Sequence, residues 1–239
     1  MRAMDLGIAG KTALVTASSG GLGLGTAAAL AAEGCHVAIN GRDPARLETA
    51  AAQLPDALTL RGDVSEPQTP ARLVAATIER FGGLDILVAN AGGPPPGRAL
   101  DVDDDALLAA IQENLLASIR LVRAALPSMR AGGWGRIVCI TSITVKQPIP
   151  DLAASNTARA GLWGWAKTAA GDLIDDGITL NLLCPGLHAT ERVRELGYAG
   201  RLGDPGDFGR VAAFLCSAHA GFVSGAALQV DAAATLGLL

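Results

Sequence analysis

Aromatic residues are scarce in this sequence. They make up 3% of the 239 residues, and Tyr198 is the only tyrosine, so chemistry that needs a phenol has one candidate side chain. Cysteine is also rare, and Cys35, Cys139, Cys184 and Cys216 stand far apart among apolar neighbours. That pattern favours small buried side chains over a metal site or a disulfide framework. We therefore expect no metal site and a reducing, cytoplasmic location.

Charged residues are few and show no basic cluster. They make up 18% of the chain, with 19 Lys and Arg against 23 Asp and Glu, which gives a net charge of -4. This balance argues against nucleic acid as a partner. Residues 12–32 carry no charge, but SSGGLGLG at their centre is too polar and glycine-rich to span a membrane. The opening MRAMDLG lacks the apolar segment of a secretion signal, so we expect no membrane partner.

Apolar runs alternate with helical segments along the whole chain. The runs, which we interpret as strands, are residues 12–17, 36–41, 57–64, 84–92, 135–142, 178–186 and 226–232. Helices are predicted at 23–32, 43–53, 71–81, 103–129 and 153–175, the fourth interrupted by Pro127. Continuous apolar strands that alternate with helices indicate parallel βαβ units covered on both faces. The sequence therefore predicts one α/β domain over residues 1–239, a doubly wound parallel sheet of about seven strands.

A glycine-rich turn follows the first predicted strand. TASSGGLGLG at 16–25 joins that strand to a helix, where exposed amides and the helix dipole can hold a pyrophosphate. Helix packing alone would also explain Gly23 and Gly25. The position of the turn after the first strand nevertheless favours nucleotide binding.

The second predicted strand ends in NGRD at 40–43. An acidic residue at this place would bind the ribose 2′-hydroxyl of NAD, whereas an arginine pairs with the 2′-phosphate of NADP. Gly41 and Arg42 therefore favour NADP(H) over NAD(H). In the competing interpretation Arg42 is a solvated loop residue and Asp43 only caps the next helix.

The order of these motifs resembles the short-chain dehydrogenase/reductase family over nearly the whole chain, especially its 3-oxoacyl-carrier-protein-reductase-like branch. TASSGGLG is similar to the family's TGxxxGxG turn, GDV at 62–64 to its adenine-contacting segment, and NAG at 90–92 to the motif beside the cofactor, while PGLHAT at 185–190 also follows in order. The resemblance implies a Rossmann-like fold, NAD(P)-linked hydride transfer on a small-molecule substrate, and a homodimer or homotetramer built on the two long helices. It assigns cofactor binding to Thr16, Ser18, Ser19, Gly21, Leu22, Gly23, Gly41, Arg42, Asp63, Val64, Asn90, Ala91, Gly92, Pro185, Gly186 and Thr190.

The catalytic motif departs from that family pattern. Asn114 and Ser142 match, but Ser155 and Arg159 stand where the family has the tyrosine and lysine of YxxxK. Ala17 and Ala233 replace two further glycines, changes that we expect small backbone shifts to accommodate. The predicted catalytic set is therefore a degenerate one: Asn114, Ser142, Ser155, Arg159 and His188.

These substitutions close the family's usual route for the proton. The family's phenol, with an ordinary pKa of about 10, is made more acidic by the neighbouring ammonium. A serine hydroxyl is a weaker acid and shorter, and an arginine cannot be deprotonated to relay a proton. The candidates that remain are His188, Tyr198, Lys146 and water. His188 has the most suitable chemistry, although a loop histidine facing water and a tyrosine covering a cleft are the competing interpretations.

Three functions stay open from the sequence. The first is an NADPH-linked oxidoreductase acting on a small carbonyl or 3-oxoacyl-type substrate with a non-standard proton donor. The second is a nucleotide-binding pseudoenzyme, a sensor or partner subunit without redox turnover. The third is a non-redox lyase, isomerase or cyclase on the same scaffold. No charge pattern in the sequence identifies the substrate.

Overall fold

Seven parallel strands form one sheet in the computed structural model, which describes residues 4–195, 197, 198 and 200–237. The strands are β1 Thr12–Val15, β2 His36–Gly41, β3 Leu58–Arg61, β4 Ile86–Ala89, β5 Gly135–Ile140, β6 Ile178–Pro185 and β7 Ala227–Val230. Their order is β3-β2-β1-β4-β5-β6-β7, and every pair is parallel. This confirms the predicted doubly wound α/β fold, in which the strand order reverses between β1 and β4.

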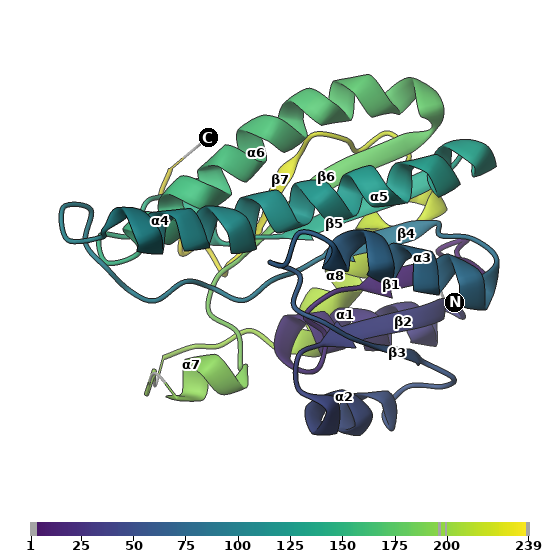
Figure 1. The fold of residues 1–239 in the computed structure, drawn as a ribbon, viewed down its shortest axis with the longest axis horizontal. Helices are drawn as coiled ribbons and strands as arrows, with labels where there is room; N and C mark the ends of the chain where they lie inside the picture. The colour runs from purple at the N-terminus through teal and green to yellow at the C-terminus, as the bar shows by residue number, and fades with distance from the viewer. Residues whose placement is uncertain (1–3, 196, 199, 238–239) are drawn as a thin grey trace.

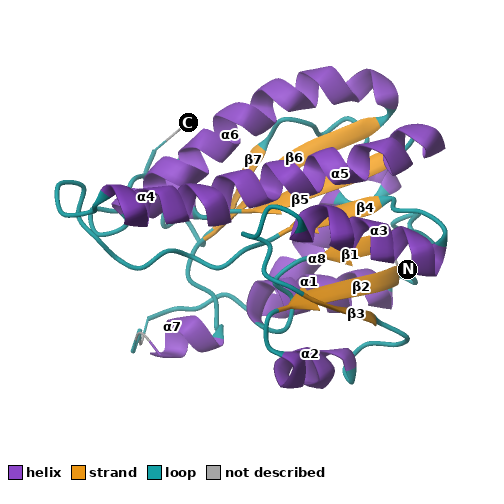
Figure 2. Ribbon diagram, viewed as in Figure 1, coloured by secondary structure: helices purple, strands orange, loops and turns teal. Residues whose placement is uncertain are grey.

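Helices cover both faces of the sheet (Figures 1 and 2). Those in the described part of the chain are α1 Gly21–Ala32, α2 Pro44–Ala51, α3 Thr69–Phe81, α4 Asp104–Ile111, α5 Ala117–Gly132, α6 Ala153–Leu173, α7 Glu191–Glu195 and α8 Pro205–Leu215. Short turns of other helix types are η1 Gln112–Leu116, η2 Ile143–Val145, η3 Ile174–Asp176 and η4 Ala218–Ala220. Figure 1 shows α7 standing away from the sheet. This segment therefore has less support from the core than the other helices.

The core is divided by the sheet into two apolar layers. Leu14 points into the layer beneath α3, α5 and α6, whereas its neighbours Ala13 and Val15 point into the layer beneath α1, α2 and α8. All three are 0% exposed. Since successive strand residues face opposite sides, a strand covered on both faces must be apolar at every position. This explains why unbroken apolar runs identified the strands.

Helix α8 packs unusually closely on α1. A Cβ on Gly209 would lie 2.1 Å from the carbonyl oxygen of Gly25, and a Cβ on Gly25 would lie 2.2 Å from the carbonyl oxygen of Pro205. No side chain fits at either contact. The packing role that we held open for Gly25 is thus confirmed, and it fixes the position of α1 under the sheet.

An aspartate followed by proline marks the start of two helices. Asp43 precedes Pro44 and caps α2, since its Oδ1 accepts hydrogen bonds from the amides of Ala45 and Arg46. The same Asp-Pro signal starts α8 at Asp204, a helix that the sequence prediction missed.

The long helix predicted at 103–129 is not broken at Pro127. Pro127 lies inside α5, which continues to Gly132. The irregularity lies earlier, at the π-helical turn Gln112–Leu116 between α4 and α5. Such turns widen the helix by one residue and are frequent at functional sites. It carries Asn114, one of the predicted catalytic residues.

Candidate functional site

The site lies where the carboxyl ends of the strands meet. β1 leads into the glycine-rich turn, β4 into Asn90 to Gly92, β5 into Ser142, and β6 into Gly186. Because parallel strands end at the same edge, these segments come together although they are far apart in sequence. The predicted site residues therefore share one edge of the sheet.

The glycine-rich turn leaves free amides at the start of α1. Gly20 occupies the N-cap position and provides no side-chain cap. Within the described ranges, the amides of Gly21, Leu22 and Gly23 donate to no protein acceptor. A helix start with free amides and a positive dipole end is suited to an anion such as a phosphate.

Several predicted cofactor residues brace this turn through their side chains. Thr16 Oγ1 donates to the Asn90 carbonyl over 2.7 Å, and Asn90 Nδ2 donates to the Ala17 carbonyl over 3.0 Å. Ser18 is fully buried, and its hydroxyl donates to the Val15 carbonyl over 2.6 Å. These side chains are occupied within the protein, so they contribute the shape of the turn.

The two alanines that replace family glycines keep a glycine-like backbone. Ala17 has φ 45° and Ala233 has φ 64°, both in the left-handed region. Both alanines thus hold a conformation that favours glycine, and at Ala17 hydrogen bonds from other segments fix it. The Ala17 amide donates to Asn40 Oδ1 and its carbonyl accepts from Asn90. Left-handed backbone at residues with a Cβ costs roughly 1–2 kcal/mol each.

A groove runs from the glycine-rich turn toward β2 and β3. It is lined by Ala17, Ser19, Asn40, Gly41, Arg42, Gly62, Asp63, Val64, Gly92 and Glu113. Most of these residues belong to the predicted cofactor set, and folding brings them together. Glu113 was missed, although it directly precedes Asn114 in the sequence. Its carboxylate lies over Gly92, where a Cβ would be 2.6 Å from Oε1.

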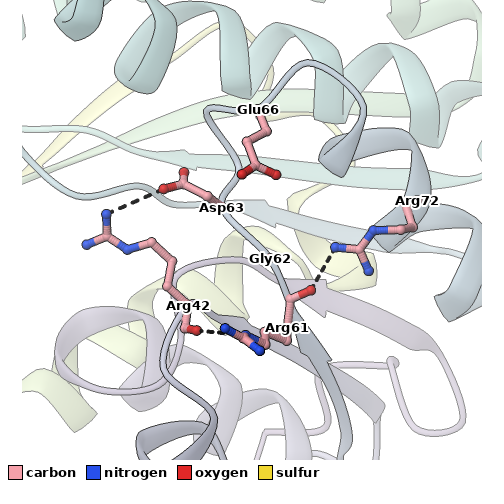
Figure 3. A pocket seen from close by; sticks show the side chains of 6 residues that line it. All are labelled: Arg42, Arg61, Gly62, Asp63, Glu66 and Arg72. Atoms are coloured by element: carbon pink, nitrogen blue, oxygen red, sulfur yellow. Dashed lines mark hydrogen bonds and ion pairs between the residues drawn. The ribbon is translucent and has the colours of Figure 1, made fainter.

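Next to this groove is a cavity of about 370 Å³ with three arginines in its wall (Figure 3). The lining residues are Arg42, Arg61, Gly62, Asp63, Glu66 and Arg72. Arg72 donates to the Arg61 carbonyl over 2.7 Å, and Arg61 Nε donates to the Arg42 carbonyl over 3.3 Å. Carbonyl contacts orient a guanidinium without neutralising it. The cavity therefore retains positive charge.

Arg42 pairs weakly with Asp63 across the mouth of this cavity. Arg42 Nη1 lies 3.5 Å from Asp63 Oδ2, and the arginine side chain is 74% exposed. Partial burial disfavours the charged form of Asp63, but hydrogen bonds from the Ser65 amide and hydroxyl, together with the Arg42 charge, hold its pKa below the ordinary value. Asp63 is thus a carboxylate at neutral pH.

Ser155 and Arg159 lie one turn apart on α6 and contact each other. Arg159 Nε donates to Ser155 Oγ over 3.2 Å, and Nη2 donates to the Gly92 carbonyl over 3.2 Å. Arg159 is 7% exposed, and Ser155 is buried beside it. Burial lowers the pKa of Arg159 to about 10, against a raising effect of Glu113. The guanidinium therefore stays charged at neutral pH without an ion-pair partner among the described residues.

Ser142 and Asn114, the two residues that match the family's catalytic pattern, differ in the hydrogen bonds that their side chains make. Ser142 Oγ accepts from the Thr144 amide over 3.2 Å, which leaves its hydroxyl proton free to donate. Asn114 is 2% exposed, and neither its Oδ1 nor its Nδ2 has a hydrogen-bond partner among the described residues. Buried amides without partners are uncommon. Asn114 is suited to holding a water molecule or a ligand.

His188 is not a loop histidine facing water, which corrects one of the competing interpretations. It is 5% exposed, and its ring packs edge-on against Phe208 with centroids 5.1 Å apart. Nδ1 lies 3.1 Å from the Gly186 carbonyl, and the ring covers Gly203, where a Cβ would lie 2.8 Å from Nε2. Its role as an acid stays a prediction. Tyr198 is 48% exposed, and its neighbours Leu196 and Ala199 lie outside the described residues.

The remaining predicted cofactor residues line the same edge. Thr190 covers the start of α1, since a Cβ on Gly21 would lie 3.3 Å from its Cγ2. Gly186, after Pro185, abuts Asp231, where a Cβ would lie 2.8 Å from its Cα. Leu22 and Ala91 pack partly buried against the two core layers. Cofactor binding by these residues stays a prediction. Their positions along the edge agree with it.

Residues 190–192 cross the edge of the sheet where the strands end, and side chains of this segment contact elements on both sides. Glu191 forms an ion pair with Arg46 of α2. Arg192 donates to the carbonyls of Gly93 and Pro94 over 3.0 and 3.3 Å. Sequence reasoning missed Arg192, whose partners are almost a hundred residues away. In this arrangement the segment spans from the glycine-rich turn to the loop after β4.

The described residues show neither a membrane-spanning helix nor a cluster of metal ligands. No helix in the described part of the chain is long and apolar enough to cross a bilayer. The described residues contain no group of three or more histidine, cysteine or acidic side chains placed to hold a metal ion. All four cysteines are buried and free, and burial raises the pKa of the Cys139 thiol to about 12. The cysteines therefore behave as the apolar side chains that the sequence predicted.

Comparisons with known proteins agree with the motifs. A family model described as enoyl-(acyl carrier protein) reductase matches residues 16–235. Human dehydrogenase/reductase SDR family member 4 is 33% identical over 241 residues, which cover 93% of this chain and 87% of that protein. Oxidoreductase asL5 of Sarocladium schorii is 33% identical over 240 residues, with 94% and 95% covered.

Solved structures show the same architecture. L-sorbose reductase from Gluconobacter frateurii, complexed with NADPH and L-sorbose, superposes with a TM-score of 0.90 at 32% identity, covering 95% of this chain and 97% of that one. A 3-oxoacyl (acyl-carrier-protein) reductase from Agrobacterium tumefaciens with NADP bound gives a TM-score of 0.86 at 30% identity, with 95% of each chain covered. Sequence, fold and the order of the site segments thus lead to one conclusion: the chain belongs to the short-chain dehydrogenase/reductase family of oxidoreductases.

Proposed function

We propose that this protein is an NADP(H)-dependent oxidoreductase that reduces a small carbonyl or 3-oxoacyl-type substrate without the usual tyrosine acid. The observation that carries the proposal is the free helix start: the amides of Gly21, Leu22 and Gly23 donate to no acceptor among the described residues, at the strand edge where family members bind their cofactor. Related reductases with NADPH or NADP bound share this fold and sequence.

The residues present fit a dinucleotide phosphate. Gly23 has no space for a side chain, since a Cβ would lie 2.5 Å from the Ala17 carbonyl oxygen, so the start of α1 packs tightly on the turn and its free amides are held in place. Ser19, Gly41, Asp63 and Val64 line the groove in which adenosine would lie. The pyrophosphate would then rest on the α1 amides.

The preference for NADP(H) rests on the arginine-lined cavity. Arg42 follows β2, where the family's acidic residue for a ribose diol would stand, and Arg61 and Arg72 add positive charge to the same wall (Figure 3). A 2′-phosphate next to a guanidinium forms strong charge-assisted hydrogen bonds. Because Arg42 is largely exposed and only weakly paired with Asp63, it is free to turn toward a phosphate. This supports the interpretation of Arg42 as a cofactor ligand over a solvated loop residue.

In the forward reaction the bound cofactor would supply a hydride to the carbonyl carbon, while the carbonyl oxygen takes up one proton to give an alcohol. Ser142 can donate a hydrogen bond to that oxygen, because its hydroxyl proton is unused. Arg159 supplies a fixed positive charge that stabilises the developing alkoxide electrostatically. We assign the proton to a water molecule held by Asn114, whose amide lacks a protein partner.

One observation favours a second candidate, a nucleotide-binding pseudoenzyme. Ser155 and Arg159 satisfy each other over 3.2 Å, and neither can act as the family's phenol and ammonium do. A protein that keeps the cofactor groove but fills the catalytic positions with a closed pair would bind a nucleotide without turnover. Measured turnover of NADPH decides between the oxidoreductase and the pseudoenzyme.

Titration calorimetry with NADPH and NADH, followed by NADPH oxidation on ketones and 3-oxoacyl thioesters, tests the proposal. We expect NADPH to bind at least about tenfold more tightly than NADH, a difference of about 1.4 kcal/mol. Arg42→Ala should remove that preference, whereas Arg98→Ala, an exposed arginine outside the groove, should keep it. Binding of neither nucleotide would refute the proposal.

Turnover separates the enzyme from the pseudoenzyme. If the parent oxidises NADPH with a neutral ketone, and Ser142→Ala slows it while His188→Ala, Tyr198→Phe and Lys146→Met do not, the proton comes from water as proposed. If His188→Ala abolishes turnover and Tyr198→Phe does not, the histidine is the acid instead. Should the parent be inactive while Ser155→Tyr with Arg159→Lys gains turnover, the pseudoenzyme is the correct function.

A further inference from the structure

Three cations lie around the catalytic edge without an ion-pair partner among the described residues: Lys146, Arg159 and Arg192. The Lys146 ammonium lies 4.3 Å from the centre of the Trp163 ring. Trp163 follows Arg159 by one turn on α6, so Lys146 packs against the same helix, one turn beyond Arg159. Arg192 reaches the same region from α7 through the carbonyls of Gly93 and Pro94.

The contacts of these cations orient them but do not neutralise them. An aromatic face attracts an ammonium through its quadrupole and leaves the net charge in place. Carbonyl and hydroxyl acceptors do the same for Arg159 and Arg192. Gathering like charges in a partly desolvated site is unfavourable unless an anion joins them. Among the described residues, these three cations therefore have no counter-ion within ion-pair distance.

The two nearest carboxylates are engaged elsewhere. Asp231 Oδ1 accepts from the Ala233 amide, and its Oδ2 accepts from both the amide and the hydroxyl of Thr235. Glu113 lies over Gly92 and lines the cofactor groove, although its field reaches Arg159. Neither carboxylate lies within ion-pair distance of Lys146. The missing anion must then come from a ligand.

We propose that the substrate is an oxo acid whose carboxylate pairs with the Lys146 ammonium, in the field of Arg159 and Arg192. This rests on the proposed oxidoreductase function and specifies its substrate class. Lys146 is half-buried on the loop that follows Ser142, the residue that would polarise the carbonyl. Because Lys146 follows Ser142 by four residues on this loop, we propose that a carboxylate held at Lys146 brings a carbonyl of the same small molecule to Ser142.

The cofactor's own phosphates do not account for Lys146. The free amides that fit a pyrophosphate belong to α1, and Thr190 covers them from the far side of the edge. Lys146 belongs to the loop between β5 and α6, beside the C-terminal segment, where the Leu236 amide donates to Gln147 Oε1. The phosphates of a bound cofactor would therefore act as counter-ions for the exposed Arg192 at most, and not for Lys146.

Matched acid and ester pairs test this proposal. The protein is first titrated with NADP+ by calorimetry, and 2-oxopentanoate, 4-oxopentanoate and their methyl esters are then titrated into the NADP+ complex and into the free protein. Neither sample contains a hydride donor, so no reduction occurs and the experiment measures binding alone. We expect at least one acid to bind the complex at least about tenfold more tightly than its ester, or about 1.4 kcal/mol. Added salt should weaken binding of the acid and leave binding of the ester unchanged.

Variants then locate the charge. Lys146→Met should reduce the acid-over-ester ratio to below about threefold, whereas Lys146→Arg should retain most of it. Lys167→Met is the matched control, since Lys167 lies on α6, also lacks an ion pair and donates to the Gly225 carbonyl. Circular dichroism verifies that each variant is folded.

Two results would overturn the proposal: no acid binding more tightly than its ester, or a Lys146→Met protein that retains the full ratio. Absence of NADP+ binding would instead count against the proposed function. The acid and ester titrations on the free protein still report on Lys146 in that case. The two failures are therefore distinguishable.

Discussion

Ala17→Gly should stabilise the protein, although it removes a methyl group from a braced turn. Ala17 holds φ 45° because Asn40 and Asn90 fix its amide and carbonyl. Relief of the left-handed backbone is worth roughly 1–2 kcal/mol. The extra freedom of glycine in the unfolded chain costs roughly 0.4–1 kcal/mol. The net gain is about 0.5–1 kcal/mol, which corresponds to a rise in Tm of roughly 2–3 °C at this chain length.

Urea unfolding followed by circular dichroism, with a thermal scan, measures this gain. Ala52→Gly is the control, because Ala52 is exposed with an ordinary φ of −60°, and glycine there should lower the free energy of unfolding by up to about 1 kcal/mol. Ala233→Gly, at φ 64°, should behave as Ala17→Gly does. If Ala17→Gly is as destabilising as the control, the backbone argument is wrong.

Three further predictions concern packing, capping and charge. Gly209→Ala should destabilise by about 1–3 kcal/mol, measured by urea unfolding, because its Cβ would lie 2.1 Å from the Gly25 carbonyl oxygen in a backbone contact that cannot yield. Asp204→Ala should cost about 1 kcal/mol in the same assay, through loss of the α8 cap, and Asp204→Asn should restore most of it. Asp63 has a depressed pKa in the folded state, so its stabilisation is present above its unfolded pKa of about 3.9 and disappears as pH falls below it. Asp63→Asn should therefore flatten the stability profile below about pH 4, and an unchanged acid limb would contradict this.

The fold was predictable because its strands are buried on both sides. A segment such as 84–92 reads as one apolar run, yet only Ile86–Ala89 pairs in the sheet. The polar and small residues beyond Ala89 form the turn that carries Asn90. Apolar composition therefore locates a strand but not its ends, since the ends depend on hydrogen bonds to other segments. The parallel sheet of about seven strands followed from the alternation of strands with helices, whereas the order of the strands was not predicted.

Helix irregularities were harder to predict. Nothing in QENLL distinguishes a π-helical turn from ordinary helix, since each residue is compatible with both. Pro127 suggested a break that does not occur. α8 could have been found, because Asp204 and Pro205 repeat the cap signal that was correctly interpreted at Asp43. The first two errors come from tertiary contacts, and the third from a local signal that was overlooked.

Within the candidate site, the sequence predicted which segments come together better than which side chains contact one another. The order of motifs placed Gly41, Arg42 and Asp63 together, and they line one groove. Arg61 directly precedes GDV, so its position could have been inferred, but nothing in the sequence connects Arg72 with that wall. His188 was placed in the correct loop with the wrong environment, because the Phe208 that covers it lies on the unpredicted α8.

The pair of Ser155 and Arg159 shows what the change in this site retains and what it removes. A buried lysine shifts its pKa readily and can pass on a proton, whereas a delocalised guanidinium keeps its charge. Burial lowers the pKa of Arg159 to about 10, which still leaves it charged at neutral pH. The site therefore keeps a positive charge near the reacting oxygen and loses the group that delivers a proton to it. Electrostatic stabilisation needs only that fixed charge, and water can deliver a proton where the oxygen is basic enough. In the proposed site, Lys146 would add a second positive charge, so we expect an anionic substrate to bind more tightly than a neutral one.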